Sequence, residues 1–580
     1  MEKKWKIKKE FNLQEIFQIK KKLADLGLPI SLQLLKLLWL RGIKSAEEIK
    51  IFLDFDYEKN VTNPFLFSEM EKAVQRIILA KEKDERIAIF GDYDADGVTA
   101  TALIFEVLKN LGFKDVLYYI PDRQIEGYGM NQEALEYLRR ENVKLIITVD
   151  CGITNIQEVE WAYKSGLEVI ITDHHHVPDI VPNALAIINP QAKNSGYPFK
   201  ELSGVGVAFK LAQALYQRIK PEEIEQLKWF LDLVAIGTIA DCTPLIGENR
   251  VLVKYGLLVL SKTRRIGLQE MFKVGKIAIN ENNVPKVYQV SFQLAPRINA
   301  AGRMDHANVS YKLIIENNRV KAREMALELE SKNQERQKLT AEIVREIKLI
   351  AENSFKDKKI IFVSNPHWPV GVLGLVAGKI CEEFGKPTAV FQKQDNELIG
   401  SLRSNRYFNV IENLEKCKKL LIRFGGHAQA AGAKVSLDKS EAFYQCLSAL
   451  AEQELSGIET TPEIDIDLEI KPQDINWEFI LEIKKMEPFG QGNEEPIFLM
   501  KDLEIIEIKQ VGNGNKHLKM MLRGKNGSPK IFNAIGFGLG NGFLNLKTGD
   551  IIDIVFHLQE DEWNGHKKLQ LKLIDLKPNG

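Results

Sequence analysis

One short stretch limits the fold of this chain more than any other. Three aspartates, Asp92, Asp94 and Asp96, stand at alternate positions between an apolar run, Arg86 to Phe90, and a segment with apolar residues at helical spacing. Gly97 allows a sharp turn between the two. Acidic groups packed this closely are costly unless water or a cation compensates them. The pattern predicts a metal-binding turn between a strand and a helix, with a solvated acidic turn as the alternative.

Strand-like and helix-like segments alternate from residue 71 to about residue 243, which is typical of a parallel, doubly wound α/β sheet. Strands are expected at Arg86 to Phe90, Val116 to Ile120, Lys144 to Val149 and Glu168 to Thr172. Three of them run directly into the acidic or imidazole residues Asp92, Asp94 and Asp96, then Asp150, and then Asp173, His174, His175 and His176. A further charge, Asp241, ends the apolar segment 234–240. Because ligands bind at the carboxyl ends of parallel strands, we expect these side chains to converge.

This set of side chains has the composition of a divalent-cation site. It offers too many oxygen ligands for one structural zinc, namely Asp94, Asp96, Asp150 and Asp241 with one or two imidazoles from His174 and His175. Carboxylate-rich sites with few imidazoles suit Mn²⁺ or Mg²⁺, and a bridging aspartate can hold two ions. Two ions about 3.5–4 Å apart are a recurrent device for attack on phosphorus. The predicted chemistry is phosphoester hydrolysis.

Length and composition limit the class of protein. At roughly 100–200 residues per domain, 580 residues suggest three or four domains. The 79 basic and 79 acidic residues balance, so any polyanion would be held by a local basic groove. Five scattered cysteines without a Cys-x-x-Cys pair argue for a reducing compartment and against a zinc knuckle. The chain start lacks a signal-peptide core and no run approaches the ~20 apolar residues of a membrane span, which favours a cytoplasmic enzyme.

Five segments are expected along the chain. Residues 1–70 are predicted to be a helical preface, 71–307 the catalytic domain, 308–357 a long connecting helix, 358–456 a second α/β domain, and 457–580 a small strand-rich barrel. The connector is predicted because about Ser310 to Asn353 contains no Pro or Gly and is rich in helix formers. Its charges are expected to face solvent.

Eight motifs, in order, resemble those of the DHH phosphoesterases, a family named for the triplet present here as Asp173-His174-His175. Within the family, the chain is similar over nearly its whole length to bacterial exonucleases specific for single strands. The triplet alone is weak evidence, whereas eight motifs in order are strong evidence. They are Gly91–Gly97, Glu126–Gly129, Val149–Gly152, Gly204–Ala208, Arg297–Arg303, His367–Gly374, Gly425–His427 and Glu487–Asn493.

The resemblance implies an architecture and a set of metal ligands. The expected fold is a DHH parallel-sheet domain, a long helix, a second α/β domain of DHHA1 type, and a C-terminal OB-type β-barrel that binds single strands. The implied ligands are Asp94, Asp96, Asp150, His174 and Asp241. His175 is expected to be a ligand or a contact to the scissile phosphate, and Asp92 a support or an added ligand. His176 departs from the family pattern and is expected to face solvent.

Substrate recognition is assigned to Arg123, Arg297, Asn299, Arg303, Arg403 and His427. The resemblance implies that Arg123 reads the 5′ end, since a guanidinium holds a terminal phosphate with two parallel bonds; an ion pair with Glu126 is the alternative. The amides near Gly204 and Gly206 precede a helical stretch and could bind an anion, although tight packing explains these glycines equally well. In the barrel, candidates for the DNA backbone are Lys516, Lys519, Arg523 and Lys525, and candidates for stacking, or for core packing, are Phe532, Phe537 and Trp563.

The expected function is a 5′-to-3′ single-stranded DNA exonuclease that uses Mn²⁺ or Mg²⁺, with two ions, and releases nucleoside 5′-monophosphates in DNA repair and recombination. Polarity and strand preference come from the resemblance alone. One alternative is a DHH phosphatase for short oligonucleotides, cyclic dinucleotides or polyphosphate, which needs no barrel. A second is a non-catalytic DNA-binding replication accessory. Single-stranded DNA is the expected partner, with single-strand-binding protein and repair helicases as candidates, and a monomer that does not bind membranes is expected.

Overall fold

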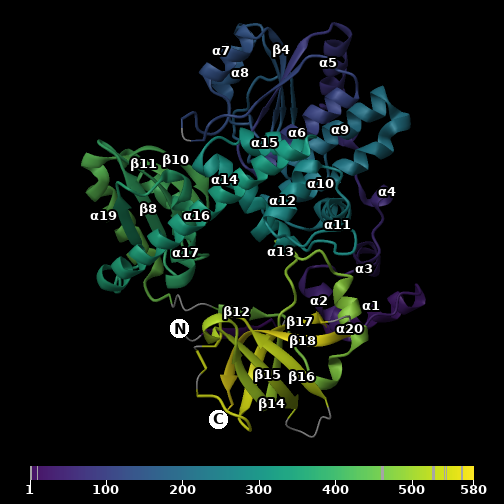
Figure 1. Cartoon of the computed structure of the whole chain (residues 1–580), viewed down its shortest axis with the longest axis vertical. Coiled ribbons are helices and arrows are strands. Elements are labelled where there is room, and N and C mark those ends of the chain that lie inside the picture. Colours follow the sequence, from purple (N-terminus) through teal and green to yellow (C-terminus); the bar gives the residue numbers. More distant parts are fainter. Residues whose placement is uncertain are drawn as a thin grey trace. The chain divides into compact units, whose positions relative to one another are not determined.

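The computed structural model describes residues 3–8, 11–123, 125–458, 463–524, 530–540, 542–543, 545–563 and 566–579, and only the backbone of residues 562, 563 and 566. The chain divides into two compact units (Figure 1). The larger unit is Val61–Thr460, and the smaller unit combines Met1–Asn60 with Thr461–Gly580. Among the described residues, no helix has both the length and the apolar character needed to cross a membrane.

The first domain of the larger unit is built on a five-stranded parallel sheet in the order β3-β2-β4-β5-β6. Four of its strands confirm the expected positions, and β6 is too short for a sequence pattern to reveal. Their bounds are β2 (Arg86–Gly91), β3 (Val116–Tyr119), β4 (Val143–Val149), β5 (Glu168–Thr172) and β6 (Ala186–Ile188). The central strands β2 and β4 are buried on both faces, which explains their nearly continuous apolar sequences.

Helices surround this sheet and continue into an all-helical layer. The crossovers and flanking helices are α5 (Met70–Glu82), α6 (Ala95–Asn110), α7 (Gln132–Arg140), α8 (Ile156–Lys164) and α9 (Gly204–Ile219). The layer that follows comprises α10 (Leu231–Ala240), α11 (Gly247–Ser261), α12 (Ile266–Val274), α13 (Val287–Gln289), the π-helical turn η3 (Val290–Leu294), α14 (Ala295–Met304) and α15 (Asn308–Ile315). Helix α10 is buried along almost its whole length because nearly all of its residues are apolar.

The expected single connecting helix is two helices. α15 ends at Ile315, and the 36-residue α16 begins at Arg319 and runs to Ser354. The break occurs because the Asn318 side chain caps α16, accepting hydrogen bonds from the amides of Val320 and Lys321. Figure 1 shows α16 between the two domains of the larger unit.

The second domain of the larger unit carries a mixed five-stranded sheet in the order β10-β11-β9-β8-β7. Its elements are β7 (Ile361–Asn365), α17 (Val370–Phe384), β8 (Thr388–Lys393), β9 (Glu397–Arg403), α18 (Val410–Lys416), β10 (Leu421–His427), β11 (Ala430–Ser436) and α19 (Ser440–Leu455). Ile343 and Ile347 of α16 join the apolar core beneath α17, so the connector is part of this domain's packing as well as a link.

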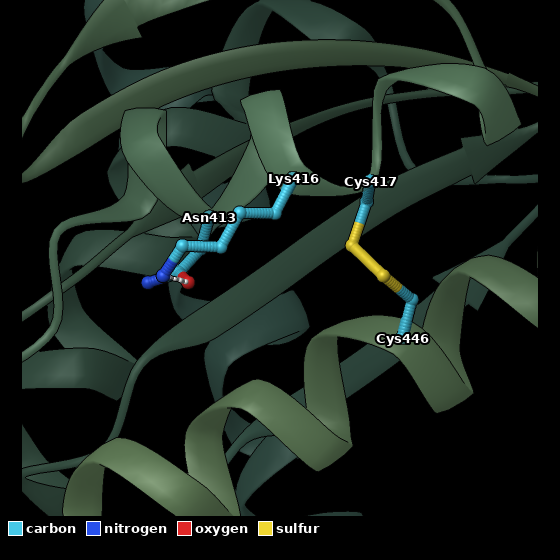
Figure 2. The surroundings of a disulfide bond; sticks show 4 residues. All are labelled: Asn413, Lys416, Cys417 and Cys446. Atoms are coloured by element: carbon cyan, nitrogen blue, oxygen red, sulfur yellow. Dashed lines mark hydrogen bonds between the residues drawn. A yellow bond between two sulfur atoms is a disulfide. The ribbon is translucent and has the colours of Figure 1, made fainter.

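A disulfide joins Cys417, which follows α18, to Cys446 in α19, with the two Cα atoms 6.3 Å apart (Figure 2). Beside it, the Lys416 ammonium donates a hydrogen bond to Asn413. Both helices contribute to one apolar core, which brings together two cysteines that are 29 residues apart. The scattered cysteines had indicated thiols that stay reduced; the disulfide departs from that expectation because sequence spacing does not reveal which residues become neighbours.

The smaller unit contains a barrel in which β14 pairs with both β15 and β17 and so closes the sheet. Its strands are β13 (Leu468–Glu469), β14 (Phe498–Val511), β15 (His517–Gly524), β16 (Ile531–Gly536), β17 (Ile551–Trp563) and β18 (His566–Pro578). In β15, Leu518, Met520 and Leu522 alternate with more exposed residues, as expected for a strand with one buried face.

The first residues of the chain share a core with this barrel. Helices α1 (Leu13–Asp25), α2 (Leu32–Leu40), α3 (Ala46–Leu53) and α20 (Trp477–Lys484) contribute to the same apolar cluster as the barrel strands, and the short α4 (Tyr57–Asn60) follows α3. The prediction of a wholly helical preface is wrong at its start, where β1 (Lys4–Ile7) pairs in parallel with β12 (Glu463–Ile466). Pairing between a strand at the start of the chain and one at Glu463–Ile466 is a long-range contact with no local sequence signal.

A buried ion pair stabilises the first domain. Lys210 of α9 and Glu248 of α11 form a salt bridge with both side chains almost completely buried. Lys210 also donates to the Thr62 carbonyl at 2.8 Å, and Tyr197 donates to Glu248 at 2.6 Å. Every charge in this group therefore has a partner.

Replacing Lys210 with Met should lower the free energy of unfolding by about 3–5 kcal/mol, because it leaves Glu248 buried without its cation. The matched control is Lys164→Met, which breaks the exposed pair with Glu160 and should cost about 0.5 kcal/mol or less. Urea unfolding followed by circular dichroism measures both changes. Equal shifts in the two variants would contradict the assignment.

Candidate metal centre

The carboxyl ends of β2, β4 and β5 bring the predicted acidic and imidazole residues to one edge of the sheet, and Asp241 joins them as the C-cap of α10. Their ligand atoms form three groups, each within 4.8 Å: Asp92, Asp94 and Asp150; Asp150, His174 and His175; and Asp96, His174 and Asp241. Because Asp150 and His174 each belong to two groups, the three form one continuous cluster. The structure thus gathers all seven residues, while their ligand roles stay a prediction.

Asp150 occupies the centre of this cluster in an unusual backbone conformation. It has φ +62°, in the left-handed region that few residues other than glycine adopt. Its amide donates to the Thr172 carbonyl at 3.0 Å, which anchors the turn to β5. Gly204 passes so close that a Cβ there would lie 2.2 Å from Asp150 Oδ1. The carboxylate is therefore held from several sides.

Two helix starts hold two of the other aspartates, Asp94 and Asp96. Asp94 caps α6 and accepts hydrogen bonds from the amides of Asp96 and Gly97. Asp96 in turn accepts the amides of Gly204 at 2.7 Å and Val205 at 2.9 Å, at the start of α9. The anion bound by these glycine-rich amides is therefore the protein's own carboxylate, which corrects the suggestion of a substrate anion at this position.

Three buried atoms of the cluster have no hydrogen-bond partner: Asp92 Oδ1, Asp150 Oδ1 and His174 Nε2. His174 Nε2 lies 3.2 Å from Asp150 Oδ1 and 3.6 Å from Asp241 Oδ2 without forming a hydrogen bond to either. Buried polar atoms rarely lack a partner, so these three indicate a group that binds between them. Carboxylate oxygens with a minority of imidazole nitrogens fit Mn²⁺ or Mg²⁺.

The charges of the cluster are unfavourable when the protein stands alone. Burial, reinforced by neighbouring aspartates, raises the pKa of Asp96 to about 7 and that of Asp241 to about 9. The pKa of Asp150 rises for the same reasons. Burial and the nearby His175 lower the pKa of His174 to about 4, which keeps its nitrogen available as a neutral ligand. A divalent cation would compensate the three carboxylates and could bind the neutral imidazole as a ligand.

Asp173, the first residue of the family triplet, orients the second histidine. Its Oδ1 lies 2.8 Å from His175 Nδ1 and accepts the amides of His174 and His175, and its Oδ2 accepts the amide of Ile153. Although burial opposes a charged imidazole, the bond to Asp173 raises the pKa of His175 to about 9. The Tyr128 hydroxyl lies 3.1 Å from the same nitrogen. The exposed His176 faces solvent, as expected.

Arginines from both domains gather beside the cluster. Burial and the charges of Arg123, Arg336 and Arg403 lower the pKa of Arg303 in α14 to about 10, while Asp94 acts in the opposite direction. The Arg123 guanidinium lies 4.9 Å from the centre of the Tyr93 ring. Within the described part of the chain no ion pair joins Arg123 to Glu126, which instead accepts hydrogen bonds from Tyr119, Asn131 and the Asp122 amide. A group of neighbouring cations favours the binding of an anion.

Arg336 of α16 belongs to this group of arginines, but the sequence did not reveal it, because the charges of this helix were expected to face solvent. Its Nε is buried without a hydrogen-bond partner, and its Nη2 donates to the buried Asn333. Asn333 is buried, so this turn of α16 faces inward.

Arg297 and Asn299 both form contacts within the protein, although Arg297 lies close enough to Arg336 to lower its pKa. Arg297 forms a salt bridge with Glu330 of α16 at 2.5 Å and donates to the Gln293 carbonyl. Asn299 accepts the amide of Ala95 and so fixes the first turn of α6. His427, exposed at the end of β10, is close enough to His174 to influence its pKa. Arg123, Arg303, Arg403 and His427 are near enough to the cluster or to one another for their charges to act there, and their role in substrate binding stays a prediction.

The candidate DNA-binding residues of the barrel differ in their exposure and in their contacts. Phe532 is buried in the barrel core, whereas Phe537 is exposed and packs edge-on against His517. Arg523 pairs with Glu504. Lys525 and the side chain of Trp563 lie outside the described residues, and Lys516 and Lys519 are exposed.

Gly204→Ala should abolish metal binding and hydrolysis, because the added methyl group would collide with Asp150. Gly378→Ala is the matched control: it also lies in a helix, and its nearest neighbour would be 4.0 Å away. Mn²⁺ affinity by isothermal titration calorimetry measures the effect. Normal Mn²⁺ binding by Gly204→Ala would contradict the close approach.

The stability of the metal-free protein should fall as pH rises from about 7 to 9. Carboxyl groups with a raised pKa favour the folded state below their ordinary pKa of about 4, and this contribution is lost progressively until pH has passed the folded pKa values of Asp96 and Asp241; between pH 7 and 9 the remaining loss comes mainly from Asp241. Mg²⁺ should reverse the loss, because it replaces the protons. Thermal unfolding in EDTA and in Mg²⁺ at pH 7 and 9 measures this; equal midpoints at both pH values in EDTA would contradict it.

Known protein families match three segments: the DHH family N-terminal domain over residues 86–238, the DHHA1 domain over 357–453 and the RecJ OB domain over 466–575. The single-stranded-DNA-specific exonuclease RecJ of Bacillus subtilis is 37% identical, over 98% of this chain and 71% of that protein. Its namesake from Haemophilus influenzae is 33% identical, over 93% of this chain and 95% of that protein.

A solved structure agrees with these matches. The crystal structure of RecJ in complex with Mn²⁺ from Thermus thermophilus aligns with a TM-score of 0.82 at 29% identity, covering 100% of this chain and 80% of that one. The RecJ structure with Mg²⁺ from the same organism aligns with a TM-score of 0.77. This chain therefore belongs to the RecJ family of DHH-domain proteins.

Proposed function

We propose that this protein is a metal-dependent exonuclease that digests single-stranded DNA from its 5′ end and releases nucleoside 5′-monophosphates in DNA repair and recombination. The observation that carries the proposal is the junction of two sites: a buried acidic cluster with unpartnered ligand atoms, and arginines of two domains directly beside it. The acidic cluster fits divalent cations, and the group of arginines fits phosphates. Relatives named as single-stranded-DNA-specific exonucleases support the choice of substrate.

Each group has a part in this reaction. Two Mn²⁺ or Mg²⁺ ions would be held by Asp94, Asp96, Asp150, His174 and Asp241, with Asp92 and His175 beside them. Such ions supply the nucleophile and stabilise the charge that develops on the phosphate. His175, kept protonated at neutral pH by Asp173, can donate a hydrogen bond to an oxygen of the scissile phosphate. If His175 instead binds a metal ion, it must first lose that proton.

The arginines account for the proposed polarity. Guanidiniums such as those of Arg123 and Arg403 can hold a phosphate through two parallel bonds, and the charges of both arginines and of Asp94 act on Arg303. A terminal 5′-phosphate carries more charge than an internal one and is favoured by such a group. The barrel, with the exposed Phe537, supplies the further contacts along the strand.

The proposed activity also suggests binding partners and a cellular location. We place the enzyme in the cytoplasm, where chromosomal single strands arise, and propose that it acts as a monomer on strands prepared by helicases and covered by single-strand-binding protein. The small-substrate phosphatase and the non-catalytic accessory remain the competing functions.

A 20-nucleotide single strand with a 5′-phosphate, labelled separately at either end, tests the function. With Mn²⁺, the 5′ label should appear first as a mononucleotide while the 3′ label stays on shortening strands, and a duplex should resist. Asp150→Ala should reduce hydrolysis by more than about 10²-fold, since even supporting residues of metal sites cost 10–100-fold. Binding in fluorescence anisotropy should persist and weaken as salt rises.

The competing functions give different results in the same experiment. A phosphatase would cleave dinucleotides while leaving the 20-nucleotide strand intact. An accessory protein would bind the strand without hydrolysing it in any metal. First release of the 3′ label would contradict the polarity alone.

A further inference from the structure

The disulfide between Cys417 and Cys446 closes a loop that contains a β-hairpin of the second domain. Cys417 precedes β10 and Cys446 follows β11, so the bond joins the two ends of the segment that carries this hairpin (Figure 2). The two cysteines are 29 residues apart. Closing a loop of this size removes conformational freedom from the segment. The disulfide therefore holds the hairpin against the helices on either side of it in sequence, α18 and α19.

One strand of the hairpin has few other contacts that fix it. β10 is the edge strand of its sheet, and within the described part of the chain it pairs only with β11. None of its seven residues is fully buried, although Leu421 and Phe424 touch the apolar core. Segments with few buried apolar contacts open at a low cost in free energy. The order of β10 should therefore depend on the disulfide.

The tip of the hairpin is bonded to α18 and to the end of β9. The amide of Val410, the first residue of α18, donates to the carbonyl of Ala428 at 2.8 Å. The amide of Ser404, which follows Arg403, donates to the next carbonyl of the tip at 2.9 Å. His427 is the last residue of β10, directly before this tip. A loosened hairpin would therefore displace His427 and disturb the surroundings of Arg403, the two candidate substrate contacts of this domain.

A second, non-covalent link joins the same two helices beside the disulfide. Lys416 of α18 forms a salt bridge with Glu454 of α19 at 2.8 Å, and the buried Asn413 donates a hydrogen bond to the same carboxylate at 2.9 Å. Figure 2 shows Asn413 and Lys416 next to the two sulfur atoms. These contacts do not depend on the redox state. They keep α18 and α19 together after reduction of the disulfide, so the two cysteines stay close enough to pair again.

We propose that Cys417 and Cys446 form a reversible redox switch, which fixes the β10–β11 hairpin when the pair is oxidised and loosens it when the pair is reduced. The inference rests on the proposed function and location, because the property that it regulates is the affinity for single-stranded DNA. The cytoplasm keeps most thiols reduced, and disulfides that form there are usually transient and redox-sensing. The co-reactant is a low-molecular-weight disulfide of the glutathione type.

The oxidation is a thiol–disulfide exchange in two steps. Cys446, the less buried of the two residues, attacks glutathione disulfide as a thiolate, forms a mixed disulfide and releases one glutathione thiolate. The Cys417 thiolate then attacks the Cys446 sulfur and releases the second glutathione thiolate. The two protons of the protein thiols end on the two glutathione molecules, and the two electrons reduce the glutathione disulfide. Reduced glutathione drives the same steps in reverse.

Thiol trapping tests the switch itself. The intact protein is equilibrated in a mostly reduced and in a mostly oxidised glutathione buffer, alkylated, and mapped by mass spectrometry. Both cysteines should carry the alkyl label in the reduced buffer and form the linked Cys417–Cys446 peptide pair in the oxidised buffer, and exchanging the buffers should reverse the result. A disulfide that survives the reduced buffer, or thiols that remain labelled in the oxidised buffer, would overturn the proposal.

The effect on substrate affinity is measured with a 5′-phosphorylated 20-nucleotide strand in Mg²⁺, a cation that prefers oxygen ligands to thiols. The KM should be about 5-fold lower in the oxidised buffer, at the lower end of typical coupling between sites, with a smaller change in kcat. Cys446→Ala should show the higher KM in both buffers. Cys242→Ala, which removes an exposed free thiol, is the matched control and should keep the full redox response. An equal KM of the intact protein in both buffers would contradict the regulation.

Hydrogen exchange separates the switch from the proposed function. The amides of β10 should exchange faster in the reduced protein than in the oxidised protein, whereas those of β8, an interior strand of the same sheet, should exchange equally in both. Equal protection of β10 in the two states would overturn the effect on the hairpin. If the protein hydrolyses no strand in either buffer, the proposed function fails, and the regulation of its substrate affinity fails with it. Thiol trapping and hydrogen exchange then decide whether the hairpin still responds to the redox state.

Discussion

The burial of several carboxylates side by side is the constraint on which this structure depends. Asp92, Asp96 and Asp150 are almost fully buried at one edge of a sheet, and burial raises their pKa values strongly. Such a cluster is tolerable only when protons or divalent cations compensate it. The parallel sheet creates the problem, because it places the ends of three strands together, and the same geometry makes a metal centre available.

The surrounding helices reduce this cost while leaving ligand atoms free. The start of α9 donates two amides to Asp96, and the start of α6 is capped by Asp94. Glycine permits the close approach: a Cβ at Gly237 would lie 2.5 Å from Asp96 Oδ1, and one at Gly204 would overlap Asp150. Fixed amide dipoles thus hold the carboxylates in place, and the unpartnered atoms of Asp92, Asp150 and His174 remain for the ions.

Although the chain has no net charge, an acidic cluster and a group of arginines lie next to each other at this site. The acidic cluster comes from the first domain, whereas Arg403 comes from β9 of the second and Arg336 from α16 between them. Bringing these cations together is unfavourable in the protein alone, as the lowered pKa of Arg303 shows. Divalent cations would relieve the repulsion among the carboxylates, and a phosphate chain bound beside them would relieve the repulsion among the arginines.

The sequence alone determined the features that depend on local pattern. Apolar runs ending in acidic residues gave the strands β2, β4 and β5 and the seven candidate metal-site residues, because the carboxyl ends of parallel strands must share an edge. The sequence could not determine which residues, distant along the chain, become neighbours in the fold. Tertiary structure alone decided that Asp96 accepts the amides at the start of α9, and that Arg297 pairs with Glu330 while Arg336 is directed inward. It also decided the disulfide between Cys417 and Cys446 and the pairing of β1 with β12. Each of these contacts joins segments whose separation in sequence carries no periodic signal, so only the packed chain reveals them.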